Sequence, residues 1–127
     1  MFGTFQQSHL RIEVDATAVQ LSRSLLQTDS FRQWLAPQQF LEPLPSRLQH
    51  DTRYSSFLGP VKIDHQVVLV DEQQLKLLLS GAIDGFHHWQ WGEGWVQSRL
   101  EGITLLPLAL AHSASLVRLQ QYLRQQS

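Results

Sequence analysis

The sequence contains no cysteine. It therefore has no disulfide framework, no thiolate zinc site, no iron–sulfur ligation and no cysteine nucleophile. It also lacks an apolar run of the ~18 residues that a membrane-spanning helix needs. Its first residues do not combine a basic stretch with an apolar core, as a secretion signal does. These absences predict a cytoplasmic protein with no integral membrane segment.

An excess of charge of one sign is also missing. Ten lysines and arginines stand against eleven aspartates and glutamates, the formal net charge is −1, and neither sign forms a block. Because nucleic-acid binding relies on clustered basic side chains that neutralise phosphates, the composition argues against a nucleic-acid partner. The sequence has no P-loop, no dinucleotide-binding glycine pattern and no Gly-x-Ser-x-Gly motif, so no cofactor is predicted.

What the sequence does contain fits one globular domain over residues 1–127. Apolar residues make up 43% of the chain and aromatic residues 9%. A chain of this length buries roughly two-thirds of its surface on folding, so it can build a core without disulfides or metal ions. The chain has no internal repeat and no linker long enough to separate two domains.

The N-terminal part predicts a strand and two helices. Alternating apolar and polar residues predict a half-buried strand over residues 8–15. Capping residues followed by apolar residues at helical spacing predict a helix over residues 17–27. Asp29 or Ser30 is expected to cap a second short helix. This helix should end near Pro37, because the residue before a proline is pushed out of the helical region.

The rest of the chain predicts a β meander and a long helix. Prolines allow at most a short edge strand after Phe40. Five further strands are predicted, over residues 52–58, 61–70, 75–80, 86–91 and 95–103. Between them lie a turn at 71–74, a loop at 81–85 and a three-residue hairpin loop at Gly92-Glu93-Gly94. An amphipathic pattern predicts a helix from Pro107 to Arg124. This order of elements predicts an α+β fold, with the helices on one face of a curved antiparallel sheet of six or seven strands.

Two segments carry a resemblance to known proteins. A strand ending in Ile12-Glu13-Val14-Asp15-Ala16 runs directly into a helix, and Trp34-Leu35-Ala36-Pro37 precedes the meander and the long last helix. In these features the chain resembles the START-like superfamily, also called SRPBCC, which includes polyketide-cyclase-like and pollen-allergen-like lipid binders. The second segment is Ile83-Asp84-Gly85-Phe86-His87-His88-Trp89-Gln90-Trp91-Gly92-Glu93-Gly94-Trp95, followed by Leu106-Pro107-Leu108. It resembles a family of small uncharacterised bacterial members of that group.

The resemblance implies a helix-grip fold. In this fold a seven-stranded antiparallel sheet wraps around the long C-terminal helix and leaves a cavity for a lipophilic ligand. Members of the superfamily include sterol and lipid carriers, cyclases, dehydratases and chaperone cofactors, so the fold alone does not choose among these functions. With 127 residues the chain is short for the group, which favours a small pocket or one filled by aromatic side chains.

The tryptophan hairpin is the first candidate site. A three-residue loop would place Trp91 opposite Trp95, and opposed residues of two paired strands share a face. That face would hold His87, Trp89, Trp91, Trp95, Gln97, Arg99 and Glu101. If it points inward, it lines a pocket suited to a planar or amphiphilic ligand. If it points outward, the tryptophans form a patch for a protein partner or a membrane surface, and a third interpretation is packing that only holds the hairpin in register.

Histidines supply the second candidate group. His65 lies on the same strand face as Ile63 and Val67, which predicts either a hydrogen-bonded core histidine or a cavity-facing general base. His87 and His88 are neighbours on a strand and point to opposite faces, so they cannot bind one ion together. No metal site is predicted.

Three functional hypotheses follow. The leading one is binding or transport of a small lipophilic or aromatic ligand in a cavity between the sheet and the last helix. The expected ligand-binding residues are Trp89, Trp91, Trp95, His87, Arg99 and His65. The first alternative is a cyclase- or dehydratase-type enzyme, which needs at least two polar groups converging in the cavity. The second is a protein-interaction module that uses the tryptophan hairpin or the last helix, in a homodimer or with another protein.

Overall fold

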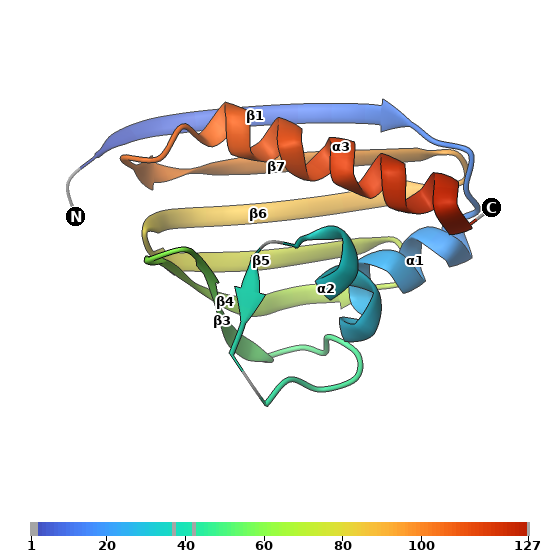
Figure 1. The fold of residues 1–127 in the computed structure, drawn as a ribbon, viewed down its shortest axis with the longest axis horizontal. Helices are drawn as coiled ribbons and strands as arrows, with labels where there is room; N and C mark the ends of the chain where they lie inside the picture. Colours follow the sequence, from blue (N-terminus) through green and yellow to red (C-terminus); the bar gives the residue numbers. More distant parts are fainter. Residues whose placement is uncertain (1–2, 37, 42, 127) are drawn as a thin grey trace.

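The computed structural model describes residues 3–36, 38–41 and 43–126. Seven strands among these residues form one curved antiparallel sheet in the order β1-β7-β6-β5-β4-β3-β2 (Figure 1). The strands are β1 (Thr4–Glu13), β2 (Gln39–Phe40), β3 (Arg53–Leu58), β4 (Val61–Asp71), β5 (Gln74–Gly81), β6 (Ile83–Gly92) and β7 (Trp95–Thr104). The helices are α1 (Ala18–Leu26), α2 (Thr28–Trp34) and α3 (Leu108–Gln126).

All three helices lie on the same side of the sheet, which we call its inner face (Figure 1). The long helix α3 runs along β1 and β7, α1 contacts β6, and α2 contacts α3. The predicted α+β class, the antiparallel sheet and the two short helices after the first strand are therefore confirmed. In the described residues no helix combines the length and the apolar character needed to cross a bilayer.

The two short helices differ in how they begin: α1 has a side-chain cap, and α2 has none. Thr17 caps α1: its hydroxyl accepts from the Gln20 amide at 3.1 Å, and the Gln20 side chain accepts from the Thr17 amide at 2.8 Å. The predicted cap of α2 is wrong, because this helix already begins at Thr28 and has Gln27 as its N-cap. The helix ends at Trp34, and the predicted breaker Pro37 lies outside the described residues.

The predicted loop at residues 81–85 is wrong. β5 ends at Gly81, whose φ is +87°, and β6 begins at Ile83, where it pairs with β7. Gly85 instead faces Gly102 across the strand pair, where a Cβ on Gly85 would lie 1.9 Å from the Glu101 carbonyl oxygen. Glycine at this position lets the two backbones approach closely. In the sequence alone, a glycine with this role looks the same as a glycine in a loop.

The register predicted for the tryptophan hairpin is also wrong, by one residue. Gly92 belongs to β6 and pairs with Trp95, so the turn contains only Glu93 and Gly94. The turn is anchored from outside the hairpin, because the Gly94 amide donates to the Ala16 carbonyl at 3.0 Å. The true partners across β6 and β7 are Trp91 with Val96, Trp89 with Ser98 and His87 with Leu100.

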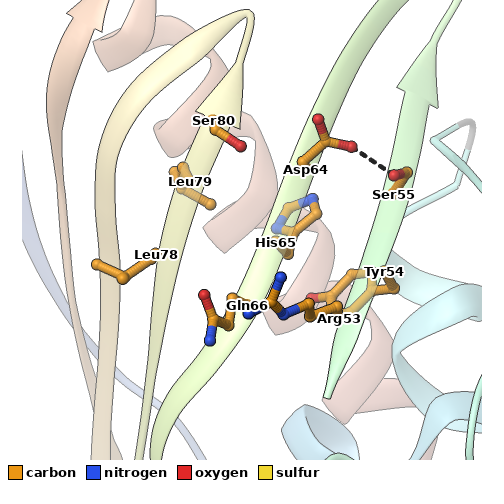
Figure 2. A pocket seen from close by; sticks show the side chains of 9 residues that line it. All are labelled: Arg53, Tyr54, Ser55, Asp64, His65, Gln66, Leu78, Leu79 and Ser80. Atoms are coloured by element: carbon orange, nitrogen blue, oxygen red, sulfur yellow. Dashed lines mark hydrogen bonds between the residues drawn. The ribbon is translucent and has the colours of Figure 1, made fainter. Parts of the chain in front are cut away.

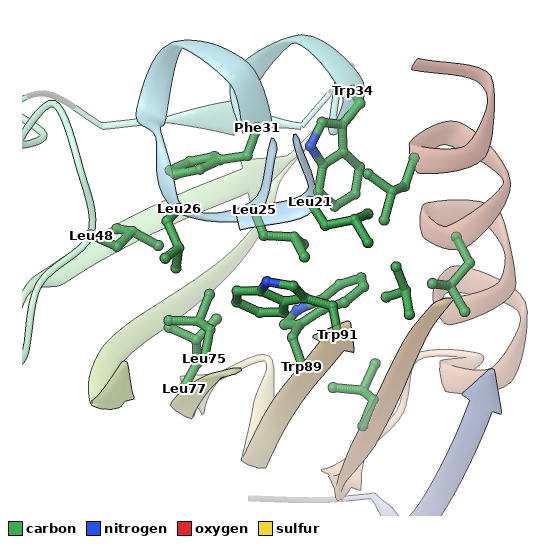
Figure 3. Packing of buried hydrophobic residues seen from close by; sticks show 14 of the residues in the cluster. Leu21, Leu25, Leu26, Phe31, Trp34, Leu48, Leu75, Leu77, Trp89 and Trp91 are labelled. Atoms are coloured by element: carbon green, nitrogen blue, oxygen red, sulfur yellow. The ribbon is translucent and has the colours of Figure 1, made fainter. Parts of the chain in front are cut away.

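This shift of one residue moves four of the seven residues of the predicted face to the other side of the sheet. Trp95, Gln97, Arg99 and Glu101 lie on the outer face, whereas His87, Trp89 and Trp91 lie on the inner face. The inner face forms the core with α1 and α3, and Figure 3 shows Trp89 and Trp91 packed among leucines beneath Trp34. Trp34 meets Trp89 edge to face, with ring centroids 5.9 Å apart.

Candidate functional site

A cavity of about 230 Å³ lies between the inner face, α2 and α3. This volume is below the roughly 300–1,000 Å³ of pockets that hold drug-sized ligands, so only a small molecule fits. Most of the wall is leucine, isoleucine or aromatic. The polar residues that line it are Gln38, Tyr54, His65, His87, His112, Ser115 and Arg118.

One polar corner of the cavity is built by β3 and β4. The His65 ring stacks on the Tyr54 ring, with centroids 4.5 Å apart and an interplanar angle of 7°. His65 Nε2 is 2.9 Å from Ser56 Oγ, and His65 Nδ1 is buried without a partner in the described residues. Burial lowers the pKa of His65 to about 4 despite the opposing charge of Asp64, and burial raises the pKa of Tyr54. Both side chains are therefore neutral at pH 7.

The second polar group is a chain of side chains that starts at the cavity wall and runs into the core. His87 Nε2 lies 2.8 Å from Ser98 Oγ, and His112 Nε2 lies 2.8 Å from the same oxygen. His112 Nδ1 lies 2.7 Å from Ser8 Oγ. The chain thus connects β6, β7, α3 and β1.

The tautomers of the two histidines are coupled through Ser98. A hydroxyl has one proton, so Ser98 donates to one ring and accepts from the other. If it donates to His87 Nε2, the neutral His87 carries its proton on Nδ1. If it accepts from His87 Nε2, the Nδ1 atom becomes an acceptor. His87 Nδ1 has no hydrogen-bond partner among the described residues. The direction of the hydrogen bond between Ser98 and His87 Nε2 therefore determines whether Nδ1 can donate to a ligand or accept from one.

The histidines of this chain are held neutral. Burial lowers the pKa of His112 to about 4, and it lowers the pKa of His87 well below its ordinary value. Neighbouring rings act in the same direction, because protonated His112 would repel a proton on His87. At pH 7 the linked side chains of His87, Ser98, His112 and Ser8 therefore offer hydrogen bonds and carry no net charge.

The structure separates the six residues predicted from the sequence. Trp89, His87 and His65 line the cavity, whereas Trp91 is only 1% exposed and belongs to the core behind the cavity wall. Trp95 and Arg99 are on the outer face and cannot reach the cavity.

The outer-face residues make contacts of their own. The Arg11 guanidinium lies 4.5 Å from the centroid of a Trp95 ring. Glu101 contacts His9 at 2.6 Å and Arg99 at 3.3 Å. Since Trp89 and Trp91 are buried, the exposed tryptophan patch considered as a partner surface is not formed.

Ser98, His112 and Arg118 were not predicted from the sequence as site residues. The predicted register places Ser98 on the face opposite to Trp89, whereas in the structure Ser98 pairs with Trp89 and shares its face. His112 could have been found, because it lies four residues after Leu108 and four before Leu116 on the buried stripe of α3. A polar residue on that stripe predicts a buried hydrogen bond.

A second hollow, of about 500 Å³, lies at β3, β4 and β5 (Figure 2). Its surface includes Arg53, Gln66 and Ser80, and the Ser55 hydroxyl donates to the Asp64 carboxylate. Asp64 also lies 3.8 Å from the Lys62 ammonium. The hollow is open and polar, and its carboxylate is already engaged, so it is the weaker candidate. No group of three potential metal ligands forms in the described part of the chain.

Comparisons with known proteins establish the fold. No protein-family model matches the sequence, and no curated protein matches it. Protein CV1439 from Chromobacterium violaceum is similar in structure, with a TM-score of 0.74 and 17% identity over 92% of this chain and 96% of that one. An Aha1 dimer from Colwellia psychrerythraea gives 0.69 and 13%, over 93% and 96% of the two chains. DynU16, from the dynemicin biosynthetic locus, gives 0.69 and 14%, over 93% of this chain and 47% of its own. At these identities the likenesses show the fold alone, and they fit the helix-grip fold that the resemblance implies.

Proposed function

We propose that the protein is a single helix-grip domain that binds and carries a small apolar or aromatic molecule in the cavity between the sheet and α3. The observation that carries the proposal is the composition of the cavity wall. A largely apolar wall with a few converging polar groups is typical of ligand sites. The Trp89 ring supplies a stacking surface beside His87, whose ring centroid lies 4.6 Å away. His87 Nδ1 supplies one directional hydrogen bond to the ligand.

The test uses 1-aminoanthracene, a neutral fluorescent probe. We expect its emission to rise on binding and the tryptophan emission to fall, because Trp89 lines the cavity. Ala114→Trp should abolish both changes, because Ala114 lines the cavity and an indole there would fill it. Ala109→Trp is the matched control, since Ala109 is exposed on the same helix. Equal binding by the two variants would contradict the proposal.

A natural ligand can be sought directly. Native mass spectrometry of the protein purified from its own source should show a bound mass that denaturation releases. The ligand should be small, because the cavity volume is about 230 Å³. Retention of a long-chain lipid by Ala114→Trp would place the binding site elsewhere.

A second candidate is a cyclase- or dehydratase-type enzyme. It is favoured by the hydrogen bonds that join His87, Ser98 and His112. When His87 Nδ1 takes a proton from a ligand, His87 Nε2 could pass its proton to Ser98 Oγ, and Ser98 could pass its own proton to His112 Nε2, so that the positive charge rests on a His112 imidazolium until the steps reverse. Conversion of the copurified molecule during incubation would support it. His87→Gln should then abolish conversion and retain binding of 1-aminoanthracene.

Self-association is a further expectation. It is supported by the neighbour from Colwellia psychrerythraea, whose structure is that of a dimer. Sedimentation equilibrium tests it: a mass of 14.6 kDa at all concentrations would contradict a homodimer.

A further inference from the structure

The charges around the cavity are unbalanced. The described residues that line it include no aspartate and no glutamate. The histidines His65, His87 and His112 are buried and neutral at pH 7. Arg118 is therefore the one charged side chain in the described lining.

Arg118 lies where the cavity meets solvent. Its side chain is partly exposed and also lines the cavity, together with Ala111, Ala114 and Ser115 of the same helix. These three neighbours are small, so the long arginine side chain has room to turn toward the cavity. In the described part of the chain the Arg118 guanidinium has no ion-pair or hydrogen-bond partner.

From this placement we infer that the ligand is a small aromatic or alicyclic carboxylic acid, bound as its anion with the carboxylate on Arg118 and the apolar body against Trp89. The inference rests on the proposed function and adds the ligand's charge. Arg118 is partly exposed, and its guanidinium can donate two parallel hydrogen bonds to a carboxylate.

A carboxylate fits this site better than a phosphate group. A single guanidinium balances one negative charge, whereas a phosphate dianion beside an apolar wall would keep uncompensated charge after losing its water. The described lining offers no second cation. The cavity volume of about 230 Å³ also leaves little room for a large head group beside an aromatic body.

The experiment compares 1-naphthylacetate with 1-naphthylacetamide, which has nearly the same shape and no charge. Both are titrated against bound 1-aminoanthracene at neutral pH. The wild type should bind the acid about ten- to a hundredfold more tightly, since a hydrogen bond to a charged group contributes about 1.5–3 kcal/mol. Arg118→Gln should remove this preference and leave the affinity for the amide unchanged. Arg118→Lys should restore only part of it.

Arg23→Gln is the matched control, because Arg23 is exposed on α1 and does not line the cavity. This variant should keep the preference for the acid. If acid and amide compete equally well in the wild type, the inference is wrong and the proposed function stands. If an acid preference survives Arg118→Gln, the assignment to Arg118 is wrong.

Two further outcomes are informative. Tighter competition by 1-naphthylmethylphosphonate than by the acid would overturn the choice of a carboxylate. If 1-aminoanthracene itself does not bind the wild type, the proposed function fails and the inference that rests on it fails too, whereas equal competition by acid and amide overturns the inference alone. Circular dichroism of each variant shows that the fold is retained.

Discussion

His112 determines much of the polar chemistry at the residue scale. It is 1% exposed on the buried stripe of a helix, where a leucine would fit the hydrophobic pattern. Its two ring nitrogens contact hydroxyls of Ser8 and Ser98, so neither nitrogen is left unpaired. A buried polar group without partners would destabilise the fold by about 1–3 kcal/mol, which explains why both partners are serines on the facing strands.

The low pKa of His112 predicts acid lability. The ring titrates near 6.5 in the unfolded chain and near 4 in the folded protein, so between these pH values the unfolded chain binds more protons. The free energy of unfolding should therefore fall as the pH drops from 6.5 to 4, by up to about 1.4 kcal/mol per pH unit for this ring. Urea unfolding at several pH values measures the slope.

A variant separates the contribution of this ring from those of His65 and His87. His112→Gln should show a smaller slope between pH 6.5 and 4 than the wild type. His50→Gln should keep the full slope, because His50 is exposed. Identical slopes for the wild type and His112→Gln would mean that His112 is not held neutral by burial.

The tryptophans give a second prediction at this scale. Trp34, Trp89 and Trp91 are each at most 4% exposed, whereas Trp95 is partly exposed beneath Arg11. Acrylamide should quench the unliganded protein much less than free indole. Trp95→Phe should remove most of the quenchable emission. Quenching as strong as that of free indole would show that the inner-face rings are accessible to solvent.

At the scale of elements, α3 packs against the sheet through a narrow stripe of buried side chains. Leu119→Ala should lower the free energy of unfolding by about 2–5 kcal/mol, because Leu119 is fully buried. Val117→Ala is the control on the opposite side of the helix, with 52% exposure, and should change it by less than about 0.5 kcal/mol. Equal losses in urea unfolding would show that α3 does not pack on the sheet as described.

The elements could be predicted where the deciding pattern is local. The alternation around Leu10 and Ile12 predicts β1, and the helical spacing of Leu116, Leu119 and Leu123 predicts α3. In both cases each buried residue lies on the periodic face that packs on the core, so the sequence periodicity is sufficient.

The hairpin register could not be predicted in this way. Gly92 and Gly94 both permit a turn, so the local pattern does not choose between a two- and a three-residue loop. The observed two-residue turn is held by a hydrogen bond from the Gly94 amide to the carbonyl of Ala16, which lies far away in the sequence. A one-residue difference in loop length then moves Trp95 and Arg99 to the outer face. The inner-face residues of β6 were grouped correctly because alternation within one strand does not depend on the register.

At the scale of the whole molecule, the cavity results from how the helices meet the sheet. α3 runs along β1 and β7, and α1 and α2 lie over the other strands (Figure 1). The cavity between α2 and α3 is lined by side chains from several elements. Small residues on α3, such as Ala111 and Ala114, leave that region partly unfilled. The same fold with larger residues there would have a filled core and no site.

This arrangement predicts that ligand binding and global stability are linked. A molecule that binds only the folded chain raises the free energy of unfolding by RT ln(1 + [L]/Kd), about 2.7 kcal/mol at 100 times Kd. Titration with 1-aminoanthracene should therefore raise the thermal midpoint continuously with the logarithm of its concentration. Ala114→Trp should show no such increase, whereas Ala109→Trp should follow the wild type. A probe that adheres to exposed apolar surface binds the unfolded chain as well, so a midpoint that stays constant or falls in the wild type would exclude the cavity as its site.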